Sequence, residues 1–118
     1  MDIFCKIINN EVPSYTLYED EVVKVFLDVN PNHPGHTLIV PKKHYQDFFD
    51  IDNETLHHIL EIAKKIAKQL KEKLNYDGIS LAENNGLGQE VKHFHLHLIP
   101  RYKDEENLSV EEVYNKLK

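Results

Sequence analysis

Three histidines at alternate positions are the feature of this 118-residue chain that points most directly to chemistry. They form the run His93-Phe94-His95-Leu96-His97. In an extended strand, successive side chains point to opposite faces, so the three imidazoles would share one side, roughly 7 Å apart along the strand. We therefore predict a surface that carries three imidazoles in a row, with Phe94 and Leu96 facing the core.

Two kinds of chemistry use such a row. Alternating strand histidines can ligate zinc. Alternatively, one imidazole can attack a phosphorus atom while a second donates a proton to the leaving group. The preceding loop favours phosphoryl chemistry, because Gly86 and Gly88 allow positive φ and so let backbone amides turn toward an anion, and Gln89 adds a neutral amide donor. A phosphate fits such a loop, whereas a cation does not.

Composition narrows the class of protein. The apolar share of 41% and the charged share of 29% are those of a globular protein, and 118 residues suffice for a single domain over 1–118. The net charge of −6 disfavours non-specific binding to nucleic acid, whose phosphates attract surplus Lys and Arg. We expect phosphate to be handled one small molecule at a time.

The composition and the first residues also indicate a cellular location. No apolar run approaches the roughly 18–20 residues that cross a bilayer, and the first residues lack the basic and apolar stretches of a secretory signal. One cysteine, Cys5, cannot form an internal disulfide, which fits a reducing compartment. We expect a cytoplasmic protein without a membrane partner.

One long helix is predicted over residues 53–74, with Asn53 as its N-cap and Asp77-Gly78 beyond its end. Its apolar residues recur at spacings of three and four, which predicts one buried stripe. That stripe comprises Leu56, Ile59, Leu60, Ala63, Ile66, Ala67, Leu70 and Leu74.

The remaining elements are short. Residues 16–29 predict a hairpin broken at 19–21, and further strands are expected over 36–40, stopped by Pro41, over 79–83 and over 93–101. A helical turn is expected over 4–9, and a capping box from Ser109 to Glu112 opens a final helix. Without regular strand–helix alternation, this predicts an α+β fold on a five-stranded, mainly antiparallel sheet, with one face left for a site or a partner.

The segment from Gly88 to Arg101 resembles the signature of the histidine triad superfamily, His-x-His-x-His with apolar spacers. Segments 3–8, 26–31 and 35–44 resemble the family as well, and the Pro41-Lys42-Lys43-His44 element resembles its Hint-like branch. The resemblance implies a HIT-like fold and a homodimer in which the long helix and one strand of each subunit join two sheets into one.

The resemblance also implies a reaction. The substrate would be a purine nucleoside monophosphate joined to a leaving group through its α-phosphorus. His95 would attack that phosphorus and form a nucleotidyl-histidine, which water hydrolyses. His97 would assist departure of the leaving group, the His93 carbonyl would orient His95, and the His93 side chain would form a supporting network with His44. A dinucleoside polyphosphate hydrolase and a purine-nucleotide-binding regulatory protein with incidental hydrolysis are the alternatives.

Nucleotide contacts follow from the same resemblance. Asp28 matches the ribose contact, and Asn84 matches a polar contact near the ribose and phosphate. The walls of the base pocket would be Phe4, Phe26 and Val29, and the phosphate cradle Gly88 and Gln89. Glu90 stands where relatives carry Ser or Thr. Its carboxylate would repel a phosphate if it pointed inward, so it either faces out or selects a cationic leaving group.

Catalysis of this type requires no cofactor, but structural zinc is a separate question. Some bacterial relatives bind zinc through a Cys-x-x-Cys pair and two histidines that correspond to His44 and His93. This chain keeps Cys5, His44 and His93 but has Asp2 at the first cysteine position. Aspartate ligates zinc less well than thiolate does, so the hypothesis is a site that is weakened or absent.

Overall fold

A single five-stranded sheet organises the computed structural model, which describes residues 2–118. The strand order is β1-β2-β3-β5-β4, and every neighbouring pair is antiparallel. The elements are α1 (Ile3–Ile8), β1 (Thr16–Glu19), β2 (Val23–Leu27), β3 (Thr37–Pro41), α2 (Asn53–Leu74), β4 (Gly78–Ala82), β5 (Leu96–Arg101) and α3 (Val110–Leu117). This architecture confirms the predicted α+β fold. No helix among the described residues is long and apolar enough to span a membrane.

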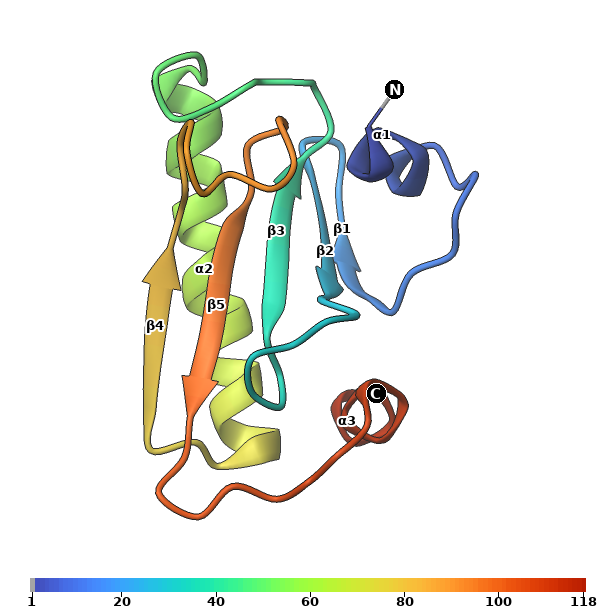
Figure 1. Ribbon diagram of the computed structural model, residues 1–118, viewed down its shortest axis with the longest axis vertical. Helices are drawn as coiled ribbons and strands as arrows, with labels where there is room; N and C mark the ends of the chain where they lie inside the picture. Colours follow the sequence, from blue (N-terminus) through green and yellow to red (C-terminus); the bar gives the residue numbers. More distant parts are fainter. Residues whose placement is uncertain (1) are drawn as a thin grey trace.

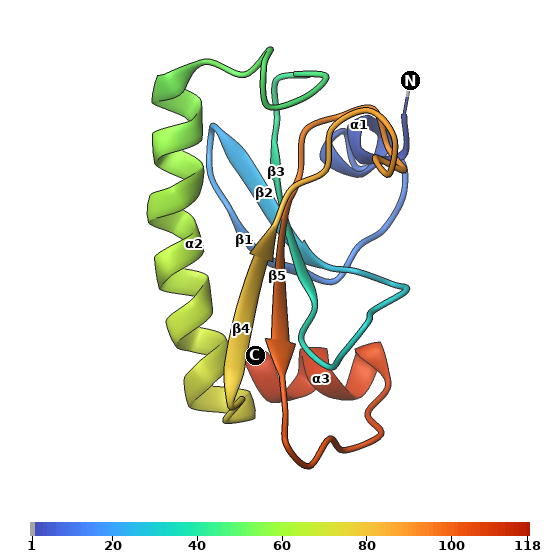
Figure 2. The same ribbon diagram turned by 60° about the vertical axis from the view of Figure 1, so that its left-hand side comes forward.

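The two faces of the sheet are covered differently. Helix α2 lies along one face, where Figure 1 shows it behind β4 and β5. The main core lies between them and includes Val25, Ile39 and Leu98 from the strands. On the opposite face, α1 covers only one end, where Phe4 and Ile7 belong to a second apolar cluster. Figure 2 shows α1 and α2 on opposite sides, with α3 below the sheet, so part of one face is left for a site.

Helix α2 has the predicted bounds but a different N-cap. Asp52 is the capping residue; it makes no side-chain capping bond, and its carboxylate accepts from the Tyr45 hydroxyl at 3.0 Å. The predicted stripe is correct except at Leu60, which is 44% exposed, whereas Ile62 is buried. Asn75 adopts the left-handed conformation at φ 50°, and its N–H returns to the Lys71 carbonyl. The helix therefore ends before Asp77-Gly78.

Several strand limits differ from the prediction. β2 ends at Leu27, two residues before the predicted end of the hairpin, and β4 begins and ends one residue earlier than predicted. β3 begins at Thr37 and includes Pro41, which pairs with Val23 at the strand end, where the missing N–H costs little. The capping box at Ser109 is present and begins α3 as predicted.

The largest correction concerns the histidine run, because β5 begins at Leu96 and not at His93. The Phe94 N–H donates outside the sheet, to the Tyr45 carbonyl at 2.7 Å, so residues 93–95 leave the strand ladder. Phe94 and Leu96 do face the α2 core as predicted. His93 and His95 are 0% and 5% exposed, so the predicted surface of three imidazoles is wrong, and two of them are buried.

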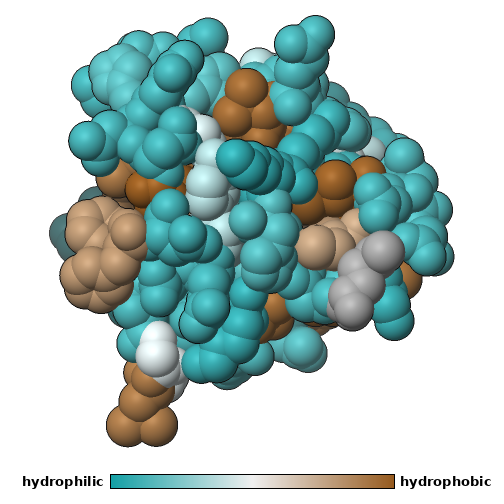
Figure 3. Space-filling view, turned by 90° about the horizontal axis from the view of Figure 1, so that it is seen from above, coloured by the Kyte–Doolittle hydropathy of each residue, from teal (hydrophilic) through white to brown (hydrophobic). Residues whose placement is uncertain are grey.

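Two loops meet at the end of the molecule that Figure 3 views from above. The Phe48 N–H donates to the Asn85 side chain at 2.8 Å, and the Gln89 side-chain amide donates to the Gln46 carbonyl at 2.6 Å. Apolar side chains stand out among hydrophilic ones here, with Leu87 fully exposed. These polar contacts join the loops at their tips, while Tyr45, Ile51 and Phe94 from the same two loops belong to the main core.

Asp20 ties the β1–β2 turn to helix α2. Its carboxylate accepts from the Tyr18 hydroxyl at 2.8 Å, from His58 Nε2 at 2.7 Å and from the backbone N–H groups of Val22 and Val23 at 2.8 Å each. Burial alone would raise the pKa of Asp20, but these donors outweigh it and lower the pKa to about 2. His58 is therefore a structural contact between α2 and this turn.

We expect Asp20→Asn to destabilise the fold in a pH-dependent way. The folded pKa of about 2 lies below the reference value of 3.8, so the charged carboxylate stabilises the fold above about pH 4 and loses this effect as the pH falls toward 2. A shift of this size corresponds to about 2 kcal/mol at pH 7. Urea unfolding between pH 7 and pH 2.5 measures it, with Glu21→Gln as the neighbouring control. An equal loss at both ends of the pH range would contradict the assignment.

Candidate active site

Two adjoining hollows lie on the face of the sheet that α2 does not cover. Strand register places Phe26, Leu38, His97 and Ala82 side by side across β2, β3, β5 and β4. One hollow, of about 240 Å³, has a mostly apolar lining that includes Phe26 and Leu38. The other, of about 280 Å³, has a polar lining that includes Ala82. Residues that line both are Asp28, Asn30, Glu90, His95 and His97.

The His95 ring is fixed at the junction of the two hollows. Its Nδ1 lies 2.8 Å from the carbonyl oxygen of His93. Since a carbonyl can only accept, Nδ1 carries the proton and Nε2 carries the free lone pair. The Phe4 ring packs edge-on against His95, with centroids 4.9 Å apart, and restricts its rotation. This is the orientation that the family resemblance implied for a nucleophile.

A chain of hydrogen bonds sets the tautomer of His97. The Asn32 N–H donates to His36 Nδ1 at 3.1 Å, which leaves the proton of a neutral His36 on Nε2. That nitrogen lies 2.9 Å from His97 Nδ1 and donates to it. His97 therefore holds its own proton on Nε2, which is buried and has no hydrogen-bond partner among the described residues. His97 thus presents an N–H donor within the site.

Burial keeps these rings neutral. It lowers the pKa of His97 to about 4, and the nearby His95 and His36 add to this effect. Burial also lowers the pKa of His36, although Asp28 opposes the shift. At neutral pH, His36 and His97 are therefore neutral donors, which is the state that the hydrogen-bond chain requires.

His36 is the residue that sequence reasoning missed. The sequence places it only at the start of the strand predicted over 36–40, yet it is 3% exposed, contacts His97 and lies 3.6 Å from the Asp28 carboxylate. Strand alternation places His36 on the same face as Leu38, two residues later, but does not by itself link that face to His97. Leu38 is the direct neighbour of His97 in the sheet.

The apolar hollow contains the three residues expected to hold a base. Phe4 and Phe26 are buried in its lining, and Val29, which is 65% exposed, lies at its edge. Asp28 borders both hollows, and its carboxylate is fixed by the Asn30 N–H at 2.9 Å. A planar apolar group and a neighbouring sugar can therefore be accommodated side by side.

The glycine loop has the predicted conformation, with φ +67° at Gly86 and +96° at Gly88. Asn84, Gly88 and Glu90 line the polar hollow. Gln89 does not, because its side chain donates to the Gln46 carbonyl and accepts from the Gly86 N–H at 3.3 Å. The expected role of the Gln89 side chain as a phosphate donor is therefore corrected, and it instead braces the loop.

The charge of the two hollows is distinctive. Among the described residues that line them, none is Lys or Arg, whereas Asp28 and Glu90 line both. Lys92, the basic residue nearest in sequence to the triad, donates to the Gly86 carbonyl at 3.0 Å instead. An anion here would be held by backbone amides and neutral imidazoles, and the site does not offer formal positive charge to a second phosphate.

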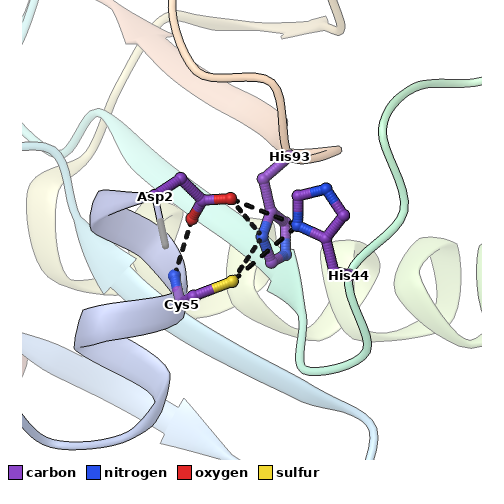
Figure 4. Close-up of side chains that lie close together, drawn as sticks. All are labelled: Asp2, Cys5, His44 and His93. Carbon is purple, nitrogen blue, oxygen red and sulfur yellow. Dashed lines mark hydrogen bonds and ion pairs between the residues drawn. The ribbon is translucent and has the colours of Figure 1, made fainter.

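A second cluster lies behind the triad, where Asp2, Cys5, His44 and His93 point toward one another (Figure 4). His93 Nε2 donates to the Pro41 carbonyl at 2.8 Å, so Nδ1 carries the lone pair that faces the cluster. Cys5 Sγ lies 3.5 Å from His93 Nδ1 and 3.7 Å from His44 Nδ1. The second Asp2 carboxylate oxygen lies 3.2 Å from His44 Nδ1 and 3.3 Å from His93 Nδ1.

These separations fit a tetrahedral metal site. With ordinary zinc bond lengths, neighbouring ligand atoms would lie about 3.4 Å apart for nitrogen and oxygen and about 3.6 Å apart for nitrogen and sulfur. The bond from His93 to Pro41 is the kind of outer contact that orients a metal-binding imidazole. Asp28, His36 and His97 also lie close together, but the separation of 2.9 Å between the two rings is a direct hydrogen bond. The cluster of Asp2, Cys5, His44 and His93 is thus the candidate metal centre.

Comparison with known proteins agrees with this geometry. Residues 9–104 match the family model for the HIT domain. The chain is 45% identical, over its full length and 99% of the relative, to an uncharacterized HIT-like protein of Methanocaldococcus jannaschii. It is 43% identical, over 92% of its length and 67% of the relative, to adenosine 5'-monophosphoramidase HNT1 of Saccharomyces cerevisiae. It is also similar to a crystal structure of a Zn-bound histidine triad family protein from Mycobacterium smegmatis, with a TM-score of 0.89, 34% identity, and coverage of 98% and 88% of the two chains.

We expect the tautomers of His95 and His97 to be opposite. Long-range proton–nitrogen NMR spectra at pH 7 should show a protonated Nδ1 in His95 and a protonated Nε2 in His97, because their partners are a carbonyl oxygen and the His36 N–H. His97 should remain neutral as the pH is lowered from 7 to about 5, since its pKa is about 4. The exposed His57 is the internal control. A protonated Nδ1 in His97 would contradict the proposed chain of hydrogen bonds.

Proposed function

This chain belongs to the histidine triad (HIT) family, and we propose that within it the protein acts as a phosphoramidase of the Hint-like branch. It is a nucleotide hydrolase of the HIT type. The proposed substrate is a purine nucleoside monophosphate joined to an amine through its α-phosphorus. The observation that carries the proposal is the opposed pair of imidazoles: His95 has its lone pair on Nε2, His97 has its N–H on Nε2, and their ring centroids are 4.8 Å apart.

This pair supports a two-step displacement. In the first step a bond forms between His95 Nε2 and phosphorus, the phosphorus–nitrogen bond breaks, and the departing nitrogen takes a proton from a water molecule, while the His97 Nε2–H donates a hydrogen bond to the phosphate. In the second step the hydroxide left by that water attacks the nucleotidyl-histidine, the bond between His95 and phosphorus breaks, and the nucleoside monophosphate is released. His97 keeps its proton throughout, because a neutral imidazole has only one N–H to give.

The charge of the hollows supports an amine over a polyphosphate as the leaving group. A dinucleoside polyphosphate would place several negative charges beside Asp28 and Glu90, in hollows whose described lining holds no Lys or Arg. An amine leaving group carries no such penalty, and one with a second ammonium group would be attracted to Glu90. Similarity to the yeast adenosine 5'-monophosphoramidase supports the same choice.

Substrate-binding roles are proposed residue by residue. Phe4, Phe26 and Val29 would hold the purine, and Asp28 would accept hydrogen bonds from the ribose hydroxyls. The phosphate would lie against His95, His97 and the backbone at Gly88, with Asn84 beside it. Glu90 would face the leaving group from the border of the two hollows.

Zinc is the group that the family implies for this chain, since a similar structure is zinc-bound. Asp2, Cys5, His44 and His93 would hold it, and their separations fit that geometry. Bound there, zinc would supply structural rigidity and not chemistry. Burial and the adjacent Asp2 both raise the pKa of the Cys5 thiol, so zinc binding there would release a proton from it.

We also propose a single domain over residues 1–118 and a cytoplasmic location.

We further propose a homodimer. β4 is an edge strand of the sheet, and its Leu81 is 53% exposed. Leu60, the exposed apolar residue of the α2 stripe, is 44% exposed. A contact between two copies through β4 and α2 would cover both side chains and remove the open edge.

The experiment that tests the proposed function compares an adenosine phosphoramidate with a diadenosine polyphosphate as substrates. The protein should release AMP mainly from the phosphoramidate. His95→Ala should lower kcat by roughly a thousandfold or more while AMP still binds, because the ring lies at the surface of the hollows and not in the α2 core. Chromatographic measurement of AMP release gives both rates.

His57→Ala, a change of an exposed histidine on α2, is the matched control and should retain full activity. In the same assay, Glu90→Lys should increase use of the polyphosphate relative to the phosphoramidate. Preference of the unmodified protein for the polyphosphate would move the assignment to that class of hydrolase. Tight AMP binding without turnover of either substrate would favour a nucleotide-binding regulatory protein.

A further inference from the structure

We propose that metal binding at the Asp2–Cys5–His44–His93 cluster and nucleotide binding beside His95 strengthen each other, and that helix α1 carries the coupling. Asp2 is the positioning residue in this proposal, because it belongs both to the cluster and to the start of α1. The proposal rests on the nucleotide-binding function proposed above. It goes beyond that function in assigning the metal a measurable effect on nucleotide affinity.

The two oxygens of the Asp2 carboxylate have different partners. One accepts from the Cys5 N–H at 2.7 Å and so caps the first turn of α1. The other faces His44 and His93, with Nδ1 atoms 3.2 Å and 3.3 Å away. Figure 4 shows the carboxylate between the helix and the two rings. A metal ion bound to the second oxygen would therefore fix the first turn of α1 to the segments that carry His44 and His93.

Helix α1 is also one wall of the nucleotide site. Ile3, Phe4 and Ile7 all line the apolar hollow. Phe4 lies between the two sites, since its ring centroid is 6.0 Å from that of His93 and 4.9 Å from that of His95. A shift of the first turn would change both the base-binding wall and the packing of the nucleophile.

The two ends of α1 are anchored by different means. At the C-terminal end, the buried Lys24 ammonium donates to the Ile7 carbonyl at 3.0 Å and to the Asn10 side chain at 3.1 Å. At the N-terminal end, Asp2 and Cys5 contact His44 and His93. A metal ion would therefore anchor the N-terminal end of α1, which Lys24 does not contact.

A carboxylate ligand, in place of a thiolate, makes the occupancy of the proposed metal site responsive to metal supply. Aspartate binds zinc less tightly than cysteine does, so occupancy can vary with metal supply instead of remaining permanent. Linkage requires that zinc raise nucleotide affinity by the same factor by which nucleotide raises zinc affinity. Couplings of this kind are typically about 5- to 150-fold, and we expect a factor of about five or more.

The test measures both affinities with AMP, which as the proposed product is not turned over. The dissociation constant of AMP is measured by calorimetry on chelator-treated and on Zn²⁺-saturated protein. Zinc affinity is measured by competition with a chromogenic chelator, with and without saturating AMP. We expect AMP to bind at least about fivefold more tightly to the zinc form, and zinc affinity to rise by the same factor.

Variants test separately the two steps of the coupling, which are metal binding at Asp2 and transmission through Phe4. Asp2→Asn keeps an oxygen that can accept from the Cys5 N–H but loses the anionic ligand, so zinc affinity should fall and the effect of zinc on AMP should disappear. Phe4→Leu should leave zinc affinity unchanged and reduce the coupling. Asp77→Asn is the control, because Asp77 likewise accepts a backbone N–H, that of Lys103 at 2.7 Å, but is not part of the cluster.

The outcomes distinguish this inference from the function on which it rests. AMP affinity that is equal in the zinc-free and zinc-loaded protein overturns the coupling and leaves the proposed function intact. Failure to bind zinc stoichiometrically also overturns the coupling alone. Failure of both forms to bind AMP overturns the proposed function and the coupling with it.

Discussion

The hydrogen bond from His95 Nδ1 to the His93 carbonyl is the contact on which the rest of the site depends. It determines which nitrogen of His95 has the lone pair, and it is available because residues 93–95 are not part of the sheet. In a regular strand that carbonyl would be directed into the ladder of a neighbouring strand. The Phe94 N–H instead bonds to the Tyr45 carbonyl, and this holds the segment away from β3. A local departure from regular structure thus creates the geometry of the nucleophile.

The same segment connects two sites with different chemistry. The backbone of His93 orients the nucleophile, while its ring, fixed by the Pro41 carbonyl, faces Cys5 and Asp2. The three histidines therefore have three roles, set by their hydrogen-bond partners: a carbonyl for His95, the His36 N–H for His97 and the Pro41 carbonyl for His93. Burial supports these roles by keeping the pKa values of His93 and His97 low, so that both rings retain a lone pair at neutral pH.

Features that depend on local sequence could be predicted, whereas features that depend on distant contacts could not. The bounds of α2, the capping box at Ser109 and the positive φ of Gly86 and Gly88 follow from periodicity and backbone chemistry. The start of β5 depends on Tyr45, and the role of Gln89 depends on Gln46, each more than forty positions away in the chain. His36 belongs to the site only because β3 and β5 are neighbours. No pattern within residues 30–40 indicates that pairing.

The proposed reaction requires that His95 Nε2 form a covalent bond to the phosphorus of a nucleotide. The most direct measurement mixes the protein with an adenosine phosphoramidate, quenches the reaction within its first turnover under conditions that preserve phosphoramidate bonds, and determines the protein mass and the modified residue by mass spectrometry. We expect an adenylyl group on His95 that disappears as AMP is released. An adduct on His93 or His97, or AMP release in the first turnover without any adduct, would contradict it.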